Sequence, residues 1–582
     1  MTKIKRLLFL CTAIIYLIPL VSCQKQDKTA ADLVLLDGKV ITVDSDFSIQ
    51  EAVAVKENKI LAAGTSSDIK KHISPKTQVI DLEQNTVLPG LIDAHAHMNS
   101  LGEELTSFNI RNCQSYEKIV EQVQKEVRTK KQGEWIIGGR WDHTQWDTKQ
   151  FPVHDALSAA SPHNPVYLAR VDGNSALVNQ KALEIAGINQ DTPNPEGGVI
   201  IKKQNGEPTG VLLNRAMNLV KTHFPPETDK NWKQKILPAV DDCVRKGLTG
   251  WHEAGVSERE IRLYKELIDQ NRLKMRVYAM LGEQEIPVID QDLYSFFKNN
   301  RVENYGDHFL EVKSIKLFFD GALGSRGAAF FRDYADDPGN KGLLRITPDY
   351  IYQVCQAALK ADMGVNTHCI GIRGNRLCLE SYIRALKENP APDHRFRIEH
   401  AQIVRKQDVD LFSEHQIIPS MQPTHCTSDM TFIEDRIGEK RCQYAYAWRS
   451  FLDAGLPIPC GSDFPVESNN PFYGIYAAIT RQDHDRNPEN GWHPEQKMNR
   501  EEAVKGFTIW AAYAAFQENI LGSIEKGKYA DFTVIDRDIL TVEPEKILNT
   551  QVLYTIVNGK IQFQSEHVSN TDIEYNKTME YD

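Results

Sequence analysis

The most constraining feature of this 582-residue sequence is an apolar run from Val87 to Ile92 that leads into two histidines, His95 and His97. In a β-strand, residues i and i+2 point to the same face, so both imidazoles can project together from the carboxyl end of one strand. Two such histidines make half of a metal site. The spacing alone is equally compatible with structural or solvated side chains, so further ligands must come from other strands.

Four more candidate ligands stand in or after short apolar segments. His400 follows His368 by 32 residues, about one strand–helix unit, and Asp463 follows His400 by 63, about two units. A strand for the missing unit falls midway, at 416–422, and Lys316 lies in an earlier apolar segment. Strand ends that recur at this spacing predict an α/β fold, a (β/α)8 TIM barrel with its catalytic residues at the C-terminal mouth.

Four motifs combine in this pattern: GLIDAHAH at 90–97, TH at 367–368, EHA at 399–401 and GSDFPV at 461–466. Together they resemble the amidohydrolase superfamily, and within it amidohydrolase family 3, which includes N-substituted formamide deformylases. The resemblance covers roughly residues 32–563. It implies a metal-dependent hydrolase that acts on amide or related C–N bonds.

Short strands at both ends of the chain predict a composite domain. Apolar segments separated by turns fill 23–86, and others fill 520–565, so we expect the two ends to build one small β-sandwich beside the barrel, as the resemblance implies. The barrel is expected over 87–519. The length before Lys316 requires an insertion at about 100–245, near the barrel mouth.

Local signals predict several elements. The segment 197–213 is predicted to be a β-hairpin that turns at Asn205-Gly206 and can roof the mouth. The segments 165–170 and 248–253 are expected to be barrel strands. Helices are expected to start at Thr347, ahead of a proline at the first helical position, and at Asn499, which has Glu502 three residues on. Residues 566–582 form a polar tail.

The first 22 residues combine Lys3, Lys5 and Arg6 with an apolar stretch, which is typical of a secretory signal. Small residues before Cys23 resemble a bacterial lipoprotein signal, which implies cleavage before Cys23, its lipidation and a membrane-anchored location on the exported side. The alternative is an ordinary signal anchor with a chance cysteine.

The charge balance excludes one class of partner. The formal net charge is −11, and removal of residues 1–22 with their three positive charges moves it to −14. No basic surplus remains to neutralise phosphates, so no nucleic-acid partner is expected. The eight cysteines after Cys23 show no paired metal spacing, and we interpret them as mostly buried free thiols, with one disulfide left open.

The ligand types predict zinc or another divalent metal, two ions per chain. Neutral imidazole and carboxylate oxygen are zinc ligands. His95, His97 and Asp463 are expected to hold one ion, and His368 with His400 the second. A protonated lysine is no ligand. In related binuclear amidohydrolases a strand lysine is carboxylated and bridges both metals, and the resemblance assigns this role to Lys316; the alternative is a barrel lysine paired with a carboxylate.

Asp463 is the predicted catalytic residue. A carboxylate there can take a proton from the metal-activated water and pass it to the departing amine. The alternative is a structural aspartate at a turn. Substrate contacts are predicted for four residues, for which loop-bracing or structural roles are equally open: Trp141, Asp172, Arg326 and His425.

The sequence departs from the family pattern at two places. Family members often carry an aspartate shortly after the histidine that corresponds to His368, but here the run continues through Ile372. Asn174 also stands where many relatives have histidine. The substrate is therefore expected to be a small amide-type molecule of open identity. A mononuclear deaminase or cyclic-amide hydrolase and a ligand-capturing lipoprotein without catalysis are the alternatives, and the oligomeric state stays open.

Overall fold

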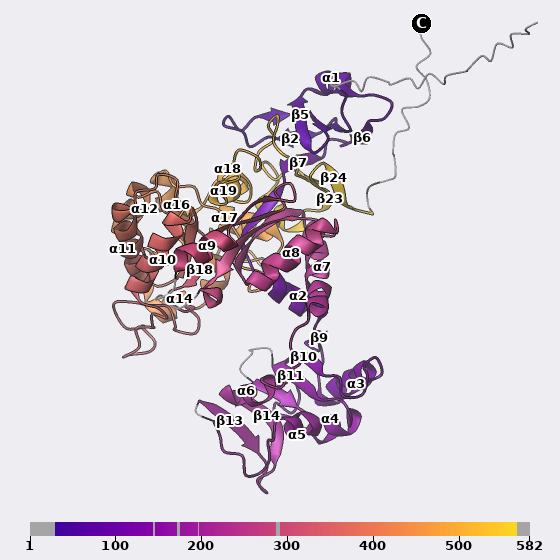
Figure 1. Cartoon of the computed structure of the whole chain (residues 1–582), viewed down its shortest axis with the longest axis vertical. Coiled ribbons are helices and arrows are strands. Elements are labelled where there is room, and N and C mark those ends of the chain that lie inside the picture. Colours follow the sequence, from indigo (N-terminus) through magenta and orange to yellow (C-terminus); the bar gives the residue numbers. More distant parts are fainter. Residues whose placement is uncertain are drawn as a thin grey trace, which may run out of the picture.

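The computed structural model describes residues 30–143, 146–170, 175–195, 197–286, 292–566 and 568. The expected signal segment, Cys23, Asp172, Asn174 and most of the polar tail lie outside these ranges. The described chain forms three bodies along its long axis (Figure 1). Two small sheets lie at one end, a barrel in the middle, and a separate sheet domain at the other end.

The two small sheets combine both ends of the chain. Their strands are β1 (Leu33–Leu36), β2 (Lys39–Ile41), β3 (Ile49–Gln50), β4 (Ala52–Lys56), β5 (Lys59–Gly64), β6 (Gln78–Asp81), β7 (Thr86–Pro89), β22 (Phe532–Ile535), β23 (Val552–Val557) and β24 (Lys560–Gln564). One sheet has the order β5-β4-β1-β6 and the other β24-β23-β22-β7-β2-β3, so β22 pairs with β7. Leu35 and Val53 of the first sheet share an apolar core with Phe532 of the second. The composite sandwich is confirmed.

Seven parallel strands form most of the barrel. They are β8 (Leu91–Ala96), β15 (Leu248–Val256), β16 (Arg276–Gly282), β18 (Leu310–Phe318), β19 (Gly364–Cys369), β20 (Arg397–His400) and β21 (Ile418–Ser420). β17 (Val302–Tyr305) pairs with β18 antiparallel. The chain at 459–464 closes the ring without a regular strand, because Cys460 bridges Met421 and Phe464 bridges Ala96. The predicted barrel is confirmed, and its eighth position is this irregular segment.

Helices follow the barrel strands and surround the ring (Figure 1). Thr347 caps α10 and Asn499 caps α18 in a capping box with Glu502, as predicted. The helices of the barrel and the terminal regions are α1 (Ser66–Ile69), α2 (Met98–Thr106), α7 (Asp229–Arg245), α8 (Glu258–Asp269), α9 (Leu293–Asn300), α10 (Pro348–Lys360), α11 (Ile372–Glu388), α12 (Lys406–Glu414), α13 (Pro423–Asp429), α14 (Ile433–Ile437), α15 (Glu439–Cys442), α16 (Trp448–Asp453), α17 (Pro471–Thr480), α18 (Arg500–Gly506) and α19 (Ile509–Ala514).

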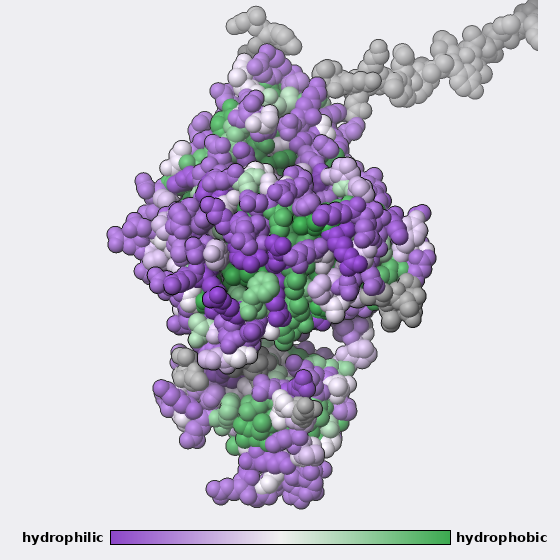
Figure 2. All heavy atoms as spheres, turned by 90° about the vertical axis from the view of Figure 1, so that its left-hand side faces the viewer, coloured by the Kyte–Doolittle hydropathy of each residue, from purple (hydrophilic) through white to green (hydrophobic). Residues whose placement is uncertain are grey.

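The insertion is a sheet domain of its own, and Figure 2 shows it as a separate lobe below the barrel. Its elements are β9 (Phe108–Asn109), α3 (Tyr116–Val127), β10 (Ile136–Trp141), α4 (Asp155–Ala160), β11 (Val166–Arg170), β12 (Ser175–Val178), α5 (Gln180–Ile185), β13 (Gly198–Lys202), β14 (Pro208–Asn214) and α6 (Asn218–Lys221). The strand order is β13-β14-β12-β11-β10-β9. The predicted hairpin is confirmed as β13 and β14, but it lies on the side away from the barrel and does not itself cover the mouth (Figure 1).

One predicted barrel strand is wrong. The segment 165–170 forms β11, which pairs with β10 and β12 inside the insertion. Its short apolar run fits any buried strand, and such a run carries no information about its partners. The other predicted strand, 248–253, is part of β15 and pairs with β8 in the barrel.

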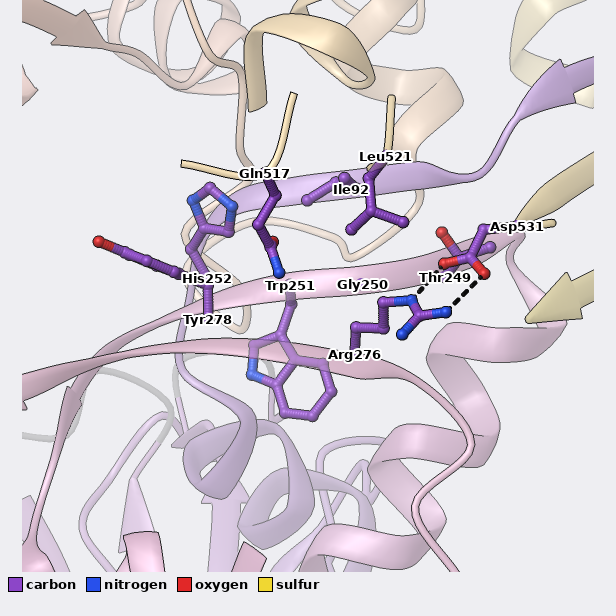
Figure 3. A pocket seen from close by; sticks show the side chains of 10 residues that line it. All are labelled: Ile92, Thr249, Gly250, Trp251, His252, Arg276, Tyr278, Gln517, Leu521 and Asp531. Carbon is purple, nitrogen blue, oxygen red and sulfur yellow. Dashed lines mark hydrogen bonds and ion pairs between the residues drawn. The ribbon is translucent and has the colours of Figure 1, made fainter. Parts of the chain in front are cut away.

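A buried ion pair fastens the barrel to the C-terminal segment. Arg276 of β16 donates to both carboxylate oxygens of Asp531, at 2.7 Å and 3.1 Å (Figure 3). Both side chains are almost fully buried. The paired geometry compensates each charge for the loss of water, so this contact fixes the terminal sheets against the barrel.

The eight cysteines of the described chain are free thiols, seven of them buried and Cys113 half-buried, as interpreted from the sequence. Among the described helices, none combines the length and apolar composition that crossing a bilayer requires.

Candidate metal centre

The predicted ligands meet at the carboxyl ends of the barrel strands. His95 lies on β8, Lys316 on β18 and His368 on β19, while His400 ends β20 and Asp463 belongs to the closing segment. Lys316 has no exposed surface, and His95, His400 and Asp463 are each less than one-tenth exposed. The fold therefore gathers groups that are distant in sequence into one buried cluster.

His95, His400 and Asp463 form the tightest group, with one ligand atom of each within 4.8 Å of the others. His97 Nε2 lies 3.1 Å from Asp463 Oδ1, and His95 Nε2 lies 3.6 Å from the same oxygen. The predicted division placed His95 and His97 with Asp463 and paired His368 with His400. In the structure, His400, which was assigned to the second ion, instead lies in one group with His95 and Asp463.

Lys316 and His368 complete the cluster. Lys316 Nζ lies 3.3 Å from His95 Nε2. The rings of His368 and His400 are edge to face, with centroids 4.5 Å apart. Asp320, at the end of the β18 region, lies 3.8 Å from His368 Nε2. All predicted metal-ligating residues thus stand at one mouth.

Burial keeps the imidazoles neutral. It lowers the pKa of His95 to about 4 and the pKa of His368 to about 3, and the charge on Lys316 lowers both further. Burial and the neighbouring His368 also hold the pKa of His400 well below its usual range. Neutral imidazoles offer a lone pair, which is the form that a metal binds.

The two remaining groups are shifted in ways that suit a metal site. Burial lowers the pKa of Lys316 to about 8, so a fraction of its amine is neutral near physiological pH. Burial opposes ionisation of Asp463, but the hydrogen bond from His97 leads the effects that hold the pKa of Asp463 well below its usual range. Asp463 is therefore an ionised carboxylate that can act as ligand and as base.

Local backbone geometry aims two of these side chains. His400 and Asp463 both have positive φ, +70° and +60°, a region that non-glycine residues seldom occupy. The Asp463 N–H donates to the carbonyl oxygen of His95 at 2.7 Å. Asp93 accepts from the Ser462 hydroxyl at 2.6 Å, which fixes the turn before Asp463.

Sequence reasoning missed three buried carboxylates that support the cluster. Asp93 holds the Asp463 turn. Glu399 lies 2.5 Å from His95 Nδ1. Asp320 accepts backbone N–H groups of Ala329 and Gly371 at 2.9 Å and 2.8 Å. A usable signal was present for Asp93, because it is an acidic residue among the apolar residues of β8.

The predicted substrate residues occupy different environments. His425 of α13 lies at the cluster: its ring stacks on His400 at 5.7 Å, and its Nε2 is 3.7 Å from Asp463 Oδ2. Trp141 is fully buried in the insertion and donates to the Leu168 carbonyl at 2.8 Å. Arg326 pairs with Asp336 at 2.8 Å in a partly exposed loop. Asp172 lies outside the described residues.

The cluster fits a divalent metal. Among the buried atoms without a hydrogen-bond partner in the described structure are three of this cluster, namely Asp463 Oδ1, His368 Nε2 and His425 Nε2. Buried polar atoms without partners are costly. A cation offers a partner to a carboxylate oxygen and to imidazole lone pairs, so the donor set matches nitrogen- and oxygen-binding metals such as zinc.

The sequence profile of the amidohydrolase family matches residues 78–563. The chain belongs to the amidohydrolase family. Protein LONG AFTER FAR-RED 3 of Arabidopsis thaliana is 31% identical over 91% of each chain. The putative amidohydrolase YtcJ of Bacillus subtilis is 28% identical over 90% of this chain and 98% of its own length. The N-substituted formamide deformylase of Arthrobacter pascens is 25% identical over 92% and 98%.

Two solved structures share the architecture. An uncharacterized metal-dependent hydrolase from Pyrococcus furiosus is 26% identical, with a TM-score of 0.73 over 88% of this chain and 100% of that chain. An uncharacterized metal-dependent hydrolase from Pyrococcus horikoshii OT3 is 23% identical to this chain, has the same TM-score of 0.73 and shares its fold.

Proposed function

We propose that this amidohydrolase is a metal-dependent enzyme that hydrolyses an amide or related C–N bond of a small molecule, of the N-acyl or N-formyl amine type. The observation that carries the proposal is the buried group of His95, His400 and Asp463 at the barrel mouth. The similarity to the Arthrobacter pascens protein named N-substituted formamide deformylase supports the reaction class.

The residues that would hold zinc or another divalent metal are His95, His97, His368, His400 and Asp463. For a second ion, a carboxylated Lys316 would act as the bridge, and its buried, partly neutral amine is the form that reacts with carbon dioxide. A bound metal lowers the pKa of water and polarises a carbonyl group.

Proton transfer falls to Asp463. Its ionised carboxylate can accept a proton from the attacking water and deliver it to the leaving amine, so that one residue acts first as base and then as acid. Among the described residues, His425 Nε2 has no hydrogen-bond partner, and it lies 3.7 Å from Asp463 Oδ2. Its nearness to the proton carrier supports a role for His425 in holding the substrate carbonyl oxygen or the departing nitrogen.

The deciding experiment combines metal analysis with a substrate panel. Purified protein would be stripped with a chelator, reloaded with zinc, and assayed on N-formyl amines, N-acyl amines, N-acyl amino acids and cyclic ureas. Activity that disappears on stripping and returns with zinc is expected. One metal per chain together with activity on the cyclic ureas alone would favour the mononuclear alternative. Bound metal with no turnover on any of the panel would favour ligand capture.

The exported, lipid-anchored location is proposed from residues 1–23 alone. The basic, apolar and small-residue order ahead of Cys23 supports it. Replacement of Cys23 with Ala should move the protein from the membrane fraction to the soluble fraction, because acyl chains provide the anchoring. Unchanged partitioning would contradict lipidation at Cys23.

A further inference from the structure

Glu399 makes the closest polar contact with a predicted ligand. Its Oε2 lies 2.5 Å from Nδ1 of His95, and the two residues are 0% and 1% exposed. An ionised carboxylate only accepts hydrogen bonds, so Nδ1 of His95 carries the hydrogen. The lone pair is then on Nε2, the nitrogen that lies 3.3 Å from Lys316 Nζ and 3.6 Å from Asp463 Oδ1. Glu399 thereby decides which nitrogen faces the centre.

Arg397 holds Glu399 in place from below. Its Nε lies 2.7 Å from Oε1 of Glu399, and its Nη2 donates to Oε2 at 3.1 Å. Nη2 also donates to the Ala94 carbonyl at 2.7 Å and to the Ser420 hydroxyl at 2.9 Å. Nη1 lies 2.9 Å from Nδ1 of His252, which projects from β15 (Figure 3). One fully buried guanidinium thus ties Glu399 to β8, β15 and β21.

His400 has a partner of a different kind. Its Nδ1 lies 2.6 Å from Oε1 of Gln422, a neutral amide. Both histidines therefore present Nε2 to the centre, but His95 has a negative partner and His400 a neutral one. A carboxylate on the far nitrogen increases the basicity of the ligating nitrogen and fixes the ring, so the two imidazoles differ in strength as ligands.

We propose that Glu399, held by Arg397, is a positioning residue that fixes the His95 tautomer and makes His95 a stronger metal ligand than His400. The inference rests on the proposed metal site and concerns the affinity of that site. It assigns Glu399 no contact with substrate or reacting atoms.

The test measures zinc affinity of the full chain. Metal-free wild type and Glu399→Gln would be titrated with zinc against a chromophoric chelator, and folding of the metal-free forms compared by circular dichroism. Glu399→Gln should bind zinc about 10- to 100-fold more weakly, the range for groups that support metal ligands. Cobalt-loaded samples should also differ in visible absorption, which a merely structural role would leave unchanged.

Glu311→Gln is the matched control. Glu311 is a buried carboxylate that lies 2.8 Å from a histidine nitrogen, that of His308, at the opposite end of β18 from Lys316. The Glu311→Gln substitution should leave the zinc affinity of the chain unchanged. Because Glu399→Gln leaves Arg397 without its countercharge, the double variant Arg397→Met with Glu399→Gln removes both charges and guards against unfolding.

The outcomes separate the two proposals. A folded Glu399→Gln or double variant that binds zinc within threefold of wild type would overturn the role of Glu399 while the metal site stands. An equal loss in Glu311→Gln would also overturn it, because the effect would then be a general one on the barrel. Wild type that binds no zinc would instead overturn the proposed function itself.

Discussion

Several buried side chains at the barrel mouth carry charge, whereas those of the insertion are apolar or neutral. Lys316, Arg397 and Glu399 have no exposed surface. In the insertion the residues with no exposed surface include Trp141, and the buried amide of Asn179 donates to the carbonyl oxygens of Ser161 and Asn164, at 3.0 Å and 2.8 Å. The barrel mouth thus buries charged side chains, whereas the insertion buries a neutral amide that hydrogen-bonds to backbone carbonyl groups.

Because of this difference, substitutions in the two regions should affect different properties of the protein. Burying charge is costly, and such groups serve stability poorly compared with apolar side chains of similar volume. Their concentration at the mouth therefore indicates chemistry, whereas the apolar core of the insertion is the ordinary source of folding free energy. Variants at the mouth should change turnover and metal binding, and variants in the insertion should change mainly the free energy of unfolding.

The largest effect is expected for Asp463→Asn. The amide keeps the size and one oxygen for the metal but cannot accept the proton, so kcat should fall by about 10²- to 10⁴-fold on the best panel substrate. Metal content, measured on the same sample, should be largely retained. A kcat near that of wild type with metal bound would exclude Asp463 as base and make His425 the leading candidate.

The same contrast explains what the sequence could predict. His95, His368, His400 and Asp463 each stand in or after a short apolar segment at barrel spacing, so the sequence could predict the barrel and the residues that meet at its mouth, though not how they group. The order of strands in the insertion was not, because the apolar run of β11 fits a barrel and an insertion sheet equally.

Partners across the fold were also unreadable from the sequence. Glu399 contacts His95 across 304 positions, and only the closed ring brings β8 and β20 together. Likewise, the closing segment at 459–464 contains no regular strand, so an alternating pattern of apolar residues could not predict its place in the barrel.

Lys316→Ala should reduce activity by at least about 10²-fold, because losing a proposed bridging ligand should cost no less than losing a group that only supports a ligand. Short-chain carboxylic acids such as acetate should partly restore activity by occupying the bridge. The control is Lys313→Ala on the same strand, since Lys313 pairs with Glu303 at 3.2 Å outside the cluster. An unmodified Lys316 in the mass spectrum of fully active protein would argue for a single-metal site.

A smaller effect than that of Lys316→Ala is expected for the pH dependence with which zinc reactivates the metal-stripped enzyme. Carbamate forms from the neutral amine, and the pKa of Lys316 is lowered by burial to about 8. The neutral fraction rises with pH through that value, by about eightfold between pH 7 and 8.5. Reactivation of stripped enzyme by zinc, at a fixed concentration of dissolved carbon dioxide, should accelerate by a similar factor. Equal rates at both pH values would disconnect Lys316 from activation.

The smallest effect on turnover is expected for Trp141→Ala in the insertion. Removal of this fully buried indole should lower the free energy of unfolding by about 3–5 kcal/mol, as for large-to-small core substitutions. Measured by urea unfolding, that loss should come with kcat and KM near wild-type values under conditions where the variant stays folded. The contrast between mouth and insertion would then hold for a residue that the sequence predicted to touch substrate.

Trp141→Phe sharpens the distinction, because it keeps most of the aromatic volume and loses only the hydrogen bond to the Leu168 carbonyl. Its unfolding free energy should drop far less than that of the alanine variant. If the phenylalanine variant were as stable as wild type but had a KM raised several-fold, the result would indicate that the indole contacts substrate and does more than pack in the core. The insertion would then belong to the active site, and the division between a chemical barrel and a structural insertion would fail.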